Sequence, residues 1–342
     1  EKLESTLEIY RKLGNYQDIK ERFDTFISSP VHYFYRNKME YSFSCIEHDM
    51  TTGEDIDDAF ALGFKRRGTW WKVENLSKAS GMFDEEWETK LIKIRDFLKA
   101  TGLTAWHPPK KEGFFRHIVV RKSFEQDQLL VNLVTSSVGL EQFDVHAFGA
   151  FLQELMGNRI AGFQHTINDN VADRAKIENG QCELVFGEPV VIEKLLGLSF
   201  EISMESFFQT NPKSAEVLYT KAIDYVFEED VPEGDVVMDL FCGTGTIGQI
   251  LSTRRSDVKI IGVQPPALDA EATIDESALT VDFEKGSNNP KDYYIATAEL
   301  DYTIEKADYS SSTGLHLQWT EKIDTYARKG IKFAPPIVGN GF

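Results

Sequence analysis

The sequence predicts a mixed α+β and α/β protein with three successive regions. Up to about residue 200, short strands alternate with helices, which is typical of an α+β domain. Over residues 236–263, a buried strand, a glycine-rich turn, a helix and a second apolar strand follow one another, as at the start of an open α/β sheet. We therefore expect an α+β domain over residues 1–203, the beginning of an α/β domain over 204–264, and a divergent, acidic, β-rich tail over 265–342.

The elements of the first region follow from apolar spacing and from residues that end helices. Residues 1–27 have helical spacing and are followed by a Ser-Ser-Pro stop at 28–30. Residues 31–73 alternate like strands. A helix is predicted over 83–100, because acids stand in its first turn and a glycine follows its end. The remaining predictions are a helix over 145–156 and strands over 117–121, 129–134, 159–166, 181–186 and 198–203.

The second and third regions have different patterns. Asn211 and Pro212 open a helix predicted to reach residue 227, because proline is favoured in the first helical turn. A buried strand over 236–240, a helix over about 246–253 and a strand over 258–263 follow. The tail has 13 acidic and 7 basic residues, and its alternating runs at 293–300 and 314–319 predict antiparallel strands with turns at 286–290 and 310–314. A parallel sheet would instead have apolar strands separated by helices.

Composition limits the class of protein. The 342 residues include 37 Lys and Arg against 55 Asp and Glu, a net charge of −18 that argues against bulk attraction to nucleic acid. No apolar stretch reaches the roughly 18 residues of a membrane span, so no membrane partner is expected. Cys45, Cys182 and Cys242 are too few and too scattered for a disulfide framework or a zinc site. We expect a monomer in a reducing, cytoplasmic setting, without a metal.

Basic residues nevertheless gather beside aromatic ones between residues 33 and 122. The clusters are Tyr-Arg-Asn-Lys (35–38), Lys-Arg-Arg-Gly-Thr-Trp-Trp-Lys (65–72), His-Pro-Pro-Lys-Lys (107–111) and Phe-Phe-Arg-His (114–117). Cations contact phosphates while rings stack on unpaired bases, so this pattern suits single-stranded RNA. The alternative is solvated strand edges with core aromatics. The predicted RNA-binding residues are Arg36, Lys38, Arg66, Arg67, Arg116 and His117; one basic face is expected from Arg36, Lys38, Lys65, Arg66, Arg67, Arg116 and Arg121.

The glycine-rich turn indicates a ligand site. Gly243 and Gly245 stand where a strand turns into a helix, and glycine lets the backbone approach a ligand closely. With Gly248 they match GxGxxG, which alone is a weak signal. No Lys-Ser/Thr follows, as a phosphate loop would require, and the strand ends in an acid, Asp239. This arrangement suits a ligand that carries an amino acid and a nucleoside, such as S-adenosylmethionine; the alternative is a turn that only packs helix on strand.

Ordered motifs at 35–40, 112–117, 131–135, 165–169, 206–211 (Ser-Phe-Phe-Gln-Thr-Asn) and 239–246 (Asp-Leu-Phe-Cys-Gly-Thr-Gly-Thr) resemble the RNA (uracil-5)-methyltransferase family over about residues 1–263. The resemblance implies a Rossmann-like, S-adenosylmethionine-dependent domain that methylates uridine C5 in ribosomal or transfer RNA. The cofactor contacts it implies are Gln209, Asp239, Phe241, Gly243, Gly245, Thr246 and Gln264. Gln264 stands where the family usually has an acid that holds the ribose, so weaker cofactor binding is expected.

The resemblance also implies chemistry whose residues are missing here. Family members add a Cys thiolate to uracil C6, which activates C5, and a carboxylate later removes the C5 proton. The family carries this Cys in a Ser-Cys-Asn-Pro segment after an Asp-Pro-Pro-Arg segment, and neither stands in these 342 residues. Gln-Pro-Pro-Ala at 264–267 is a faint echo. We therefore identify no catalytic residue and expect a methyltransferase domain that is incomplete or altered after residue 263.

Two alternatives remain open at this point. One is a non-catalytic RNA-binding relative that retains the cofactor turn, and the other is a methyltransferase for a different substrate. Some family members also hold an iron–sulfur cluster through a Cys near the position of residues 75–80. That stretch has no Cys in this chain, so no cluster is expected.

Overall fold

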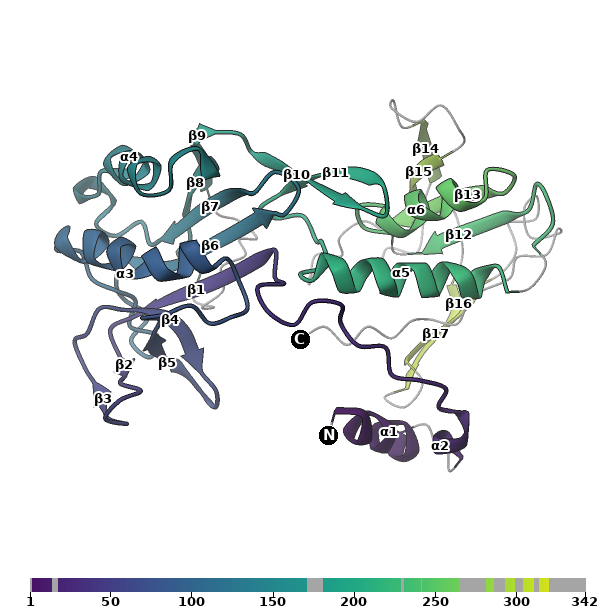
Figure 1. Ribbon diagram of the computed structural model, residues 1–342, viewed down its shortest axis with the longest axis horizontal. Helices are drawn as coiled ribbons and strands as arrows, with labels where there is room; N and C mark the ends of the chain where they lie inside the picture. Colours follow the sequence, from purple (N-terminus) through teal and green to yellow (C-terminus); the bar gives the residue numbers. More distant parts are fainter. Residues whose placement is uncertain are drawn as a thin grey trace. The chain divides into compact units, whose positions relative to one another are not determined.

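The computed structural model describes residues 2–13, 18–170, 181–228, 231–240, 242–264, 281–285, 293–298, 304–310 and 314–319 (Figure 1). Contacts group the chain into two units. Residues 30–217 form the central unit, and residues 1–29 together with 218–342 form the terminal unit. The boundary between units falls inside one helix, α5 (Pro212–Val226). The domain boundary near residue 203 therefore stays a prediction.

The central unit is built on a nine-stranded mixed sheet. Its strand order is β3-β2-β5-β4-β1-β6-β7-β8-β9. Most neighbours are antiparallel, but β2 and β5 are parallel, and so are β7 and β8, between which helix α4 crosses. The strands are β1 (Lys38–Ser44), β2 (Glu47–His48), β3 (Asp55–Ile56), β4 (Ala61–Arg66), β5 (Thr69–Asn75), β6 (Phe115–Ser123), β7 (Gln128–Thr135), β8 (Ile160–Ile167) and β9 (Gln181–Gly187). The strands predicted over 117–121, 129–134, 159–166 and 181–186 are thus confirmed.

Two helices pack on one side of this sheet. They are α3 (Glu85–Ala100) and α4 (Val145–Met156), with short 3₁₀ turns at Leu140–Gln142 and Gly157–Arg159. On α3, Trp87, Leu91, Ile94 and Leu98 repeat at helical spacing and are buried in one core with side chains of β1, β6 and β7. Asp84 begins the helix, since its carboxylate accepts a hydrogen bond from Trp87 N (2.9 Å).

A hairpin covers the opposite side of the central strands. It consists of β10 (Val190–Leu195), which was not predicted, and β11 (Leu198–Ser203), which was. Val191 from this hairpin lies in a second core cluster with Val119 and Leu130, whereas Ile118 and Val120 belong to the first cluster. Strand β6 is therefore buried on both faces, and every residue from Phe115 to Arg121 is buried.

The terminal unit contains the expected strand–turn–helix–strand. Strands β12 (Val236–Leu240) and β13 (Lys259–Gln264) are parallel, and helix α6 (Thr246–Arg254) connects them. The sheet continues in the order β12-β13-β15-β14 with β14 (Val281–Lys285) and β15 (Tyr293–Ala298). The same unit includes helices α1 (Lys2–Leu13) and α2 (Ile19–Arg22), so residues 23–27, predicted to be helical, are not. At Phe23 the backbone becomes extended (ψ 114°), which ends α2.

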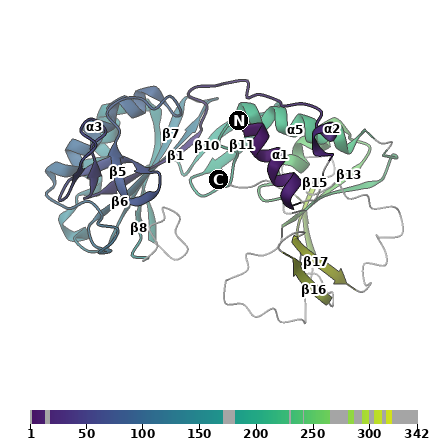
Figure 2. The ribbon, with the colours of Figure 1, turned by 90° about the horizontal axis from the view of Figure 1, so that it is seen from below.

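The tail is only partly as predicted. Strand β15 is antiparallel to β14 but parallel to β13, so the expectation of a purely antiparallel tail is wrong. Strands β16 (Ile304–Ser310) and β17 (Gly314–Trp319) do form an antiparallel hairpin, and Figure 2 shows them side by side. The turn predicted at 286–290 and most of that at 310–314 lie outside the described residues. Within the part of the chain that the structure describes, every helix is too short or too polar to cross a lipid bilayer.

Candidate functional site

The glycine turn at the end of β12 is held in a conformation that favours glycine. Gly243 and Gly245 have positive φ angles of 55° and 70°. Gly245 N donates to Cys242 O (2.8 Å), which closes the turn before α6 begins at Thr246. Among the residues that the structure describes, none has an atom within 4 Å of a Cβ built on Gly243, so backbone conformation rather than crowding disfavours a side chain there.

Asp239 joins the strand to the helix. Its Oδ2 accepts a hydrogen bond from Gly248 N (2.8 Å), so the carboxylate caps the first turn of α6 from inside the fold. Burial raises the pKa of Asp239, and the hydrogen bond from Gly248 offsets part of that rise. Beside it, the hydroxyls of Thr244 and Thr246 lie 2.9 Å apart, and Thr246 is buried. Hydrogen bonds within the turn and to α6 thus fix the Asp239 carboxylate and the two threonine hydroxyls.

The predicted ribose-binding position lies at the same edge of the sheet. In the parallel pair β12–β13, Asp239 stands opposite Gly262 and Leu240 opposite Val263. Gln264 is the last residue of β13, so its backbone is at the carboxyl end of the strand beside the turn. The structure thus brings together Asp239, Gly243, Gly245, Thr246 and the backbone of Gln264; Phe241 lies outside the described residues.

Gln209 belongs to a segment of the central unit that is tied down through its main chain. Asn37 donates its side-chain amide to Gln209 O (3.1 Å) and its backbone N–H to Thr210 O (2.8 Å). Earlier in the same segment, Lys38 Nζ donates to Met204 O (2.9 Å). Asn211 then caps α5, because its Oδ1 accepts from Ser214 N (3.0 Å). Residues 204–211, which we call the anchored segment, are therefore fixed from β1 and the residue before it.

Arg121 completes this attachment from β6. Its Nη2 donates to Ser206 O (2.6 Å) and to Met204 O (3.3 Å), and the side chain is 1% exposed. Burial lowers the pKa of Arg121 to about 10. The prediction that Arg121 belongs to an exposed basic face is therefore wrong. A guanidinium that is enclosed between a strand and a loop binds carbonyl oxygens instead of solvent-exposed phosphates.

Arg116 and His117 contradict the same prediction. Both residues are fully buried, because β6 is covered on its two faces. Arg116 donates to Asn168 O and to Asn170 O (2.9 Å), and its guanidinium carbon lies 4.2 Å from the centre of the Trp106 ring. His117 Nδ1 lies 3.3 Å from Ser42 Oγ. Arg116 is therefore a residue that holds the loop after β8, not part of an exposed face.

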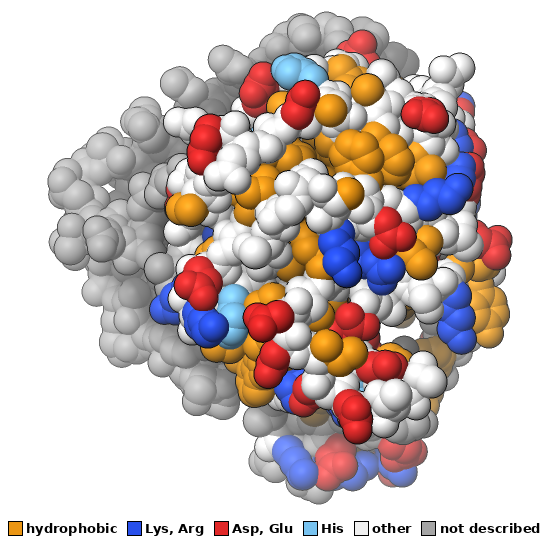
Figure 3. All heavy atoms as spheres, turned by 90° about the vertical axis from the view of Figure 1, so that its left-hand side faces the viewer, with side chains coloured by type: hydrophobic (Ala, Val, Ile, Leu, Met, Phe, Trp, Pro, Cys, Tyr) orange, Lys and Arg blue, Asp and Glu red, His pale blue; other side chains and the backbone are white. Residues whose placement is uncertain are grey.

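The other predicted RNA contacts differ in position. Arg36 is half-buried and donates from Nε to Lys38 O (3.2 Å). Arg66 and Arg67 lie at the turn between β4 and β5, where Arg67 is exposed. One continuous basic face is therefore not formed by the predicted set. Figure 3 shows the face on the left-hand side of Figure 1, where Lys and Arg side chains are interspersed with Asp and Glu.

The three cysteines do not form a reactive cluster. Burial raises the pKa of the thiols of Cys45 and Cys242, and the charge of Asp239 adds to the rise at Cys242. Cys182 is exposed on β9. All three are free thiols. Among the described residues, no group of three or more His, Cys, Asp or Glu side chains is arranged to hold a metal ion. The absence of an iron–sulfur cluster stays a prediction.

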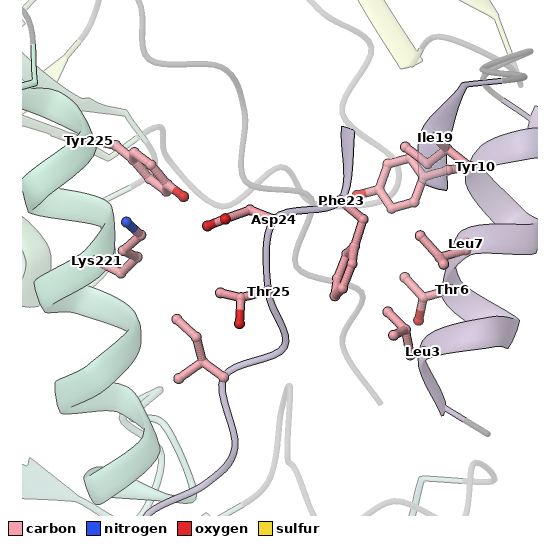
Figure 4. A pocket seen from close by; sticks show the side chains of 11 residues that line it. Leu3, Thr6, Leu7, Tyr10, Ile19, Phe23, Asp24, Thr25, Lys221 and Tyr225 are labelled. Atoms are coloured by element: carbon pink, nitrogen blue, oxygen red, sulfur yellow. The ribbon is translucent and has the colours of Figure 1, made fainter. Parts of the chain in front are cut away.

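A cavity in the terminal unit is separate from this turn. It has a volume of about 390 Å³ and lies between α1, residues 23–27 and α5 (Figure 4). Lys221 and Tyr225 enter it from α5, and the ammonium of Lys221 lies 4.4 Å from the centre of the Tyr225 ring. Most of the other lining side chains are apolar. None of the predicted cofactor residues lines this cavity.

Sequence reasoning missed how the motifs at 35–40 and 206–211 are connected. Asn37 links the two motifs directly through its hydrogen bond to Gln209 O. Its place between two basic residues of the first motif was a signal for such a structural role. The amide of Gly248 was also missed as the partner of Asp239. The sequence contained a signal for this contact, because an acid at the end of a strand can cap a helix that starts seven residues later.

Comparisons with known proteins agree with the motifs. No protein-family model matches the chain. It is 33% identical over 238 residues to an uncharacterised RNA methyltransferase of Clostridium tetani, covering 69% of this chain and 48% of that protein. An uncharacterised RNA methyltransferase of Caldanaerobacter subterraneus is 34% identical over 236 residues, with the same coverages of 69% and 48%. A tRNA (uracil(54)-C(5))-methyltransferase of Pyrococcus horikoshii is 29% identical over 201 residues, covering 59% of this chain and 44% of that protein.

A solved structure shares the fold. The crystal structure of Pyrococcus abyssi tRNA (uracil-54, C5)-methyltransferase in complex with S-adenosyl-L-homocysteine matches with a TM-score of 0.51 and 21% identity, covering 76% of this chain and 56% of that one. This likeness confirms the predicted fold class. The chain spans about half the length of the curated relatives it matches. Over most of its length the chain thus resembles RNA methyltransferases, in agreement with the RNA (uracil-5)-methyltransferase family that its sequence motifs indicate.

Proposed function

We propose that this chain functions as an S-adenosylmethionine-dependent methyltransferase that acts on uridine C5 in ribosomal or transfer RNA. The observation that carries the proposal is the β12–turn–α6 junction, with two glycines at positive φ and a half-buried acid that caps the helix. Support comes from the relatives, which are named RNA methyltransferases, and from the Pyrococcus abyssi protein, whose crystal structure contains S-adenosyl-L-homocysteine.

The residues of the turn fit such a cofactor. When bound, S-adenosylmethionine supplies a methyl group on a positively charged sulfur. The open backbone at Gly243 allows close approach, and the carboxylate of Asp239 can face an ammonium group. Thr246 and the carboxyl end of β13 at Gln264 border the same turn. Gln209 and Phe241 complete the proposed cofactor set by resemblance to the family. Because glutamine lacks the charge of the usual acid, we expect weak binding.

Calorimetric titration with S-adenosylhomocysteine tests the cofactor proposal. Gly245→Val should abolish the binding heat, because valine at φ 70° distorts the turn and places a side chain in it. Gly234→Val is the matched control, since Gly234 also has a positive φ (82°) but stands before β12 and has an open surrounding. Binding that survives Gly245→Val, with both variants folded, contradicts a site at this turn.

A second candidate is a non-catalytic RNA-binding protein that retains the cofactor turn. It is favoured by the cysteines: the pKa of Cys45 and of Cys242 is raised, which reduces the thiolate available for addition to uracil C6. RNA that carries 5-fluorouridine separates the two candidates when the cofactor is present, because fluorine at C5 cannot leave as a proton and an active enzyme stays attached. We expect no denaturation-resistant adduct with these 342 residues. An adduct mapped to Cys45, Cys182 or Cys242 would reverse this conclusion.

The remaining proposals concern partners and location. We propose RNA as the partner, a monomer as the oligomeric state and the cytoplasm as the location. The free thiols of the three cysteines support a reducing compartment. Sedimentation at micromolar protein concentration, with and without RNA, tests the monomer.

A further inference from the structure

The β4–β5 hairpin exposes a large aromatic ring. Trp70, the second residue of β5, is 53% exposed, in a strand where Val73 is the one buried residue. Its ring meets that of Trp71 edge to face, with centroids 5.8 Å apart and an interplanar angle of 85°. Trp71 is half-buried, so this contact restricts the orientation of Trp70 while leaving much of its surface accessible to a ligand.

The hairpin that carries this ring is locally basic in an otherwise acidic chain. Residues 61–75 contain four Lys and Arg and one Glu, a net charge of +3, whereas the whole chain has −18. Arg67 is exposed at the turn, next to Gly68, whose positive φ (84°) lets the hairpin reverse sharply. Lys72 is paired with Asp55 of β3. Arg66 is half-buried and Arg67 is exposed, whereas Arg116 and Arg121 are buried against main-chain carbonyls.

Resting on the proposed function, we propose that this hairpin binds a single-stranded segment of the RNA substrate, with an unpaired base stacked on Trp70 and phosphates beside Arg66 and Arg67. An exposed indole offers a flat face that any unpaired base can cover, whereas bases in a duplex already stack on one another. The local charge complements the RNA backbone and is opposite to that of the rest of the protein. The alternation of cations with one large ring fits a nucleotide chain better than an apolar protein surface, which would need a wider patch.

The stacking contact is tested with the full chain and a fluorescein-labelled, uridine-rich single-stranded RNA of twelve nucleotides. By fluorescence anisotropy, Trp70→Ala should weaken binding about 5- to 150-fold, the usual range for loss of one stacked base. Trp70→Phe should stay closer to wild type, since its ring still stacks. Phe26→Ala is the matched control, because Phe26 is a similarly exposed aromatic residue (58%) in the terminal unit and should leave the affinity unchanged. Unlabelled RNA should also quench tryptophan fluorescence in wild type, and Trp70→Phe should lose most of that quenching.

The phosphate contacts are tested by salt dependence. Arg66→Gln with Arg67→Gln should reduce the slope of log affinity against log salt by about 1.4, the value for two contacts to a single strand. Lys93→Gln with Lys99→Gln removes two exposed charges from α3 and should leave the slope unchanged. Equal affinity, slope and quenching for the hairpin variants and wild type would overturn the inference and leave the hairpin to another partner, such as a protein. Failure of wild type to bind any RNA would instead refute the RNA substrate of the proposed function.

Discussion

Replacing Asp239 by Asn and by Ala separates two roles of one side chain. The carboxylate caps α6 through Gly248 N, and in the proposed site it also faces the ligand. Asn keeps an oxygen that can accept from the same N–H, but it has no charge. Ala keeps neither the acceptor nor the charge. The two variants should therefore differ in stability and agree in ligand affinity.

The expected stability change follows from the groups that Asp239 touches. Asp239→Ala leaves the buried Gly248 amide without this acceptor, and loss of a helix cap of this kind costs about 0.5–2 kcal/mol, with unsatisfied buried groups costing about 1–3 kcal/mol. Both ranges describe the loss of the same hydrogen bond and are not added, so we expect a decrease of about 2 kcal/mol in the free energy of unfolding. Asp239→Asn should change the free energy of unfolding much less, because the cap survives.

The pH dependence of the free energy of unfolding shows whether the charge of Asp239 stabilises or destabilises the fold. Burial raises the pKa of Asp239 in the folded state, so the folded protein binds this proton more tightly than the unfolded chain does. The contribution of Asp239 to stability is then full below the unfolded pKa, about 3.9, and is lost as the pH rises through the folded pKa. Asn does not titrate. Relative to wild type, Asp239→Asn should therefore gain stability as the pH rises from 4 to 7.

Urea unfolding at several pH values and titration with S-adenosylhomocysteine make up the assay. A charged hydrogen bond contributes about 1.5–3 kcal/mol, so loss of the charge should weaken ligand binding by at least about tenfold in both variants. Two results would refute this reasoning. One is Asp239→Asn losing as much stability as Asp239→Ala at pH 7. The other is wild-type ligand affinity in Asp239→Asn, which would show that the carboxylate serves the fold alone.

Two further predictions concern the central unit. Asp84→Ala should lower the free energy of unfolding by about 3 kcal/mol, because it removes the nearly buried partner of Arg159 (2.6 Å) and Lys122 (2.7 Å). Burial alone would raise the pKa of Asp84, but hydrogen bonds from these two cations lower it below its usual value. The contribution of these ion pairs to stability is therefore present above about pH 4 and is lost on acidification. In chemical unfolding, the free energies of unfolding of wild type and variant should converge at low pH. Arg121→Met should cost about 2 kcal/mol, since it removes the donor to Ser206 O, and it should speed proteolysis of the anchored segment. When the folded fractions are equal, Arg121→Met should bind RNA as tightly as wild type. A loss of affinity would indicate that Arg121 contacts RNA.

The elements of the cofactor turn were predictable because their signals are local. An apolar run ending in an acid, two glycines and a helical period place β12, α6 and β13 within one residue of their predicted limits. The α3 helix was equally clear, with Asp84 before it and Gly102 after it. In each case residues close in sequence determine the local structure, so these elements can be predicted without knowing the long-range contacts.

The burial of Arg116 and Arg121 could not be predicted in this way. Both residues stand in β6 on either side of the apolar run at residues 118–120, and basic residues that flank such a run are usually solvated. The second face of β6 is instead covered by the β10–β11 hairpin, about seventy residues later in the chain. Val191 of that hairpin packs on Val119, and this long-range contact has no signature near residue 116. Sequence periodicity reports which residues share a face but not which element covers it.

The anchored segment shows why two distant motifs occur in the same chain. Asn37 and Lys38 from the first motif, with Arg121, bind the carbonyl oxygens that precede and include Gln209. Carbonyl dipoles attract cations as phosphates do, so a basic residue beside an aromatic one is compatible with either use. Burial decides between them: Lys38, Arg116 and Arg121 bind main-chain carbonyls of the chain itself, whereas Arg67 of the β4–β5 hairpin is exposed and Arg66 is half-buried. Lys38 and Arg121 therefore hold the segment that contains Gln209, whereas RNA recognition by the central unit is expected to depend on Arg66 and Arg67.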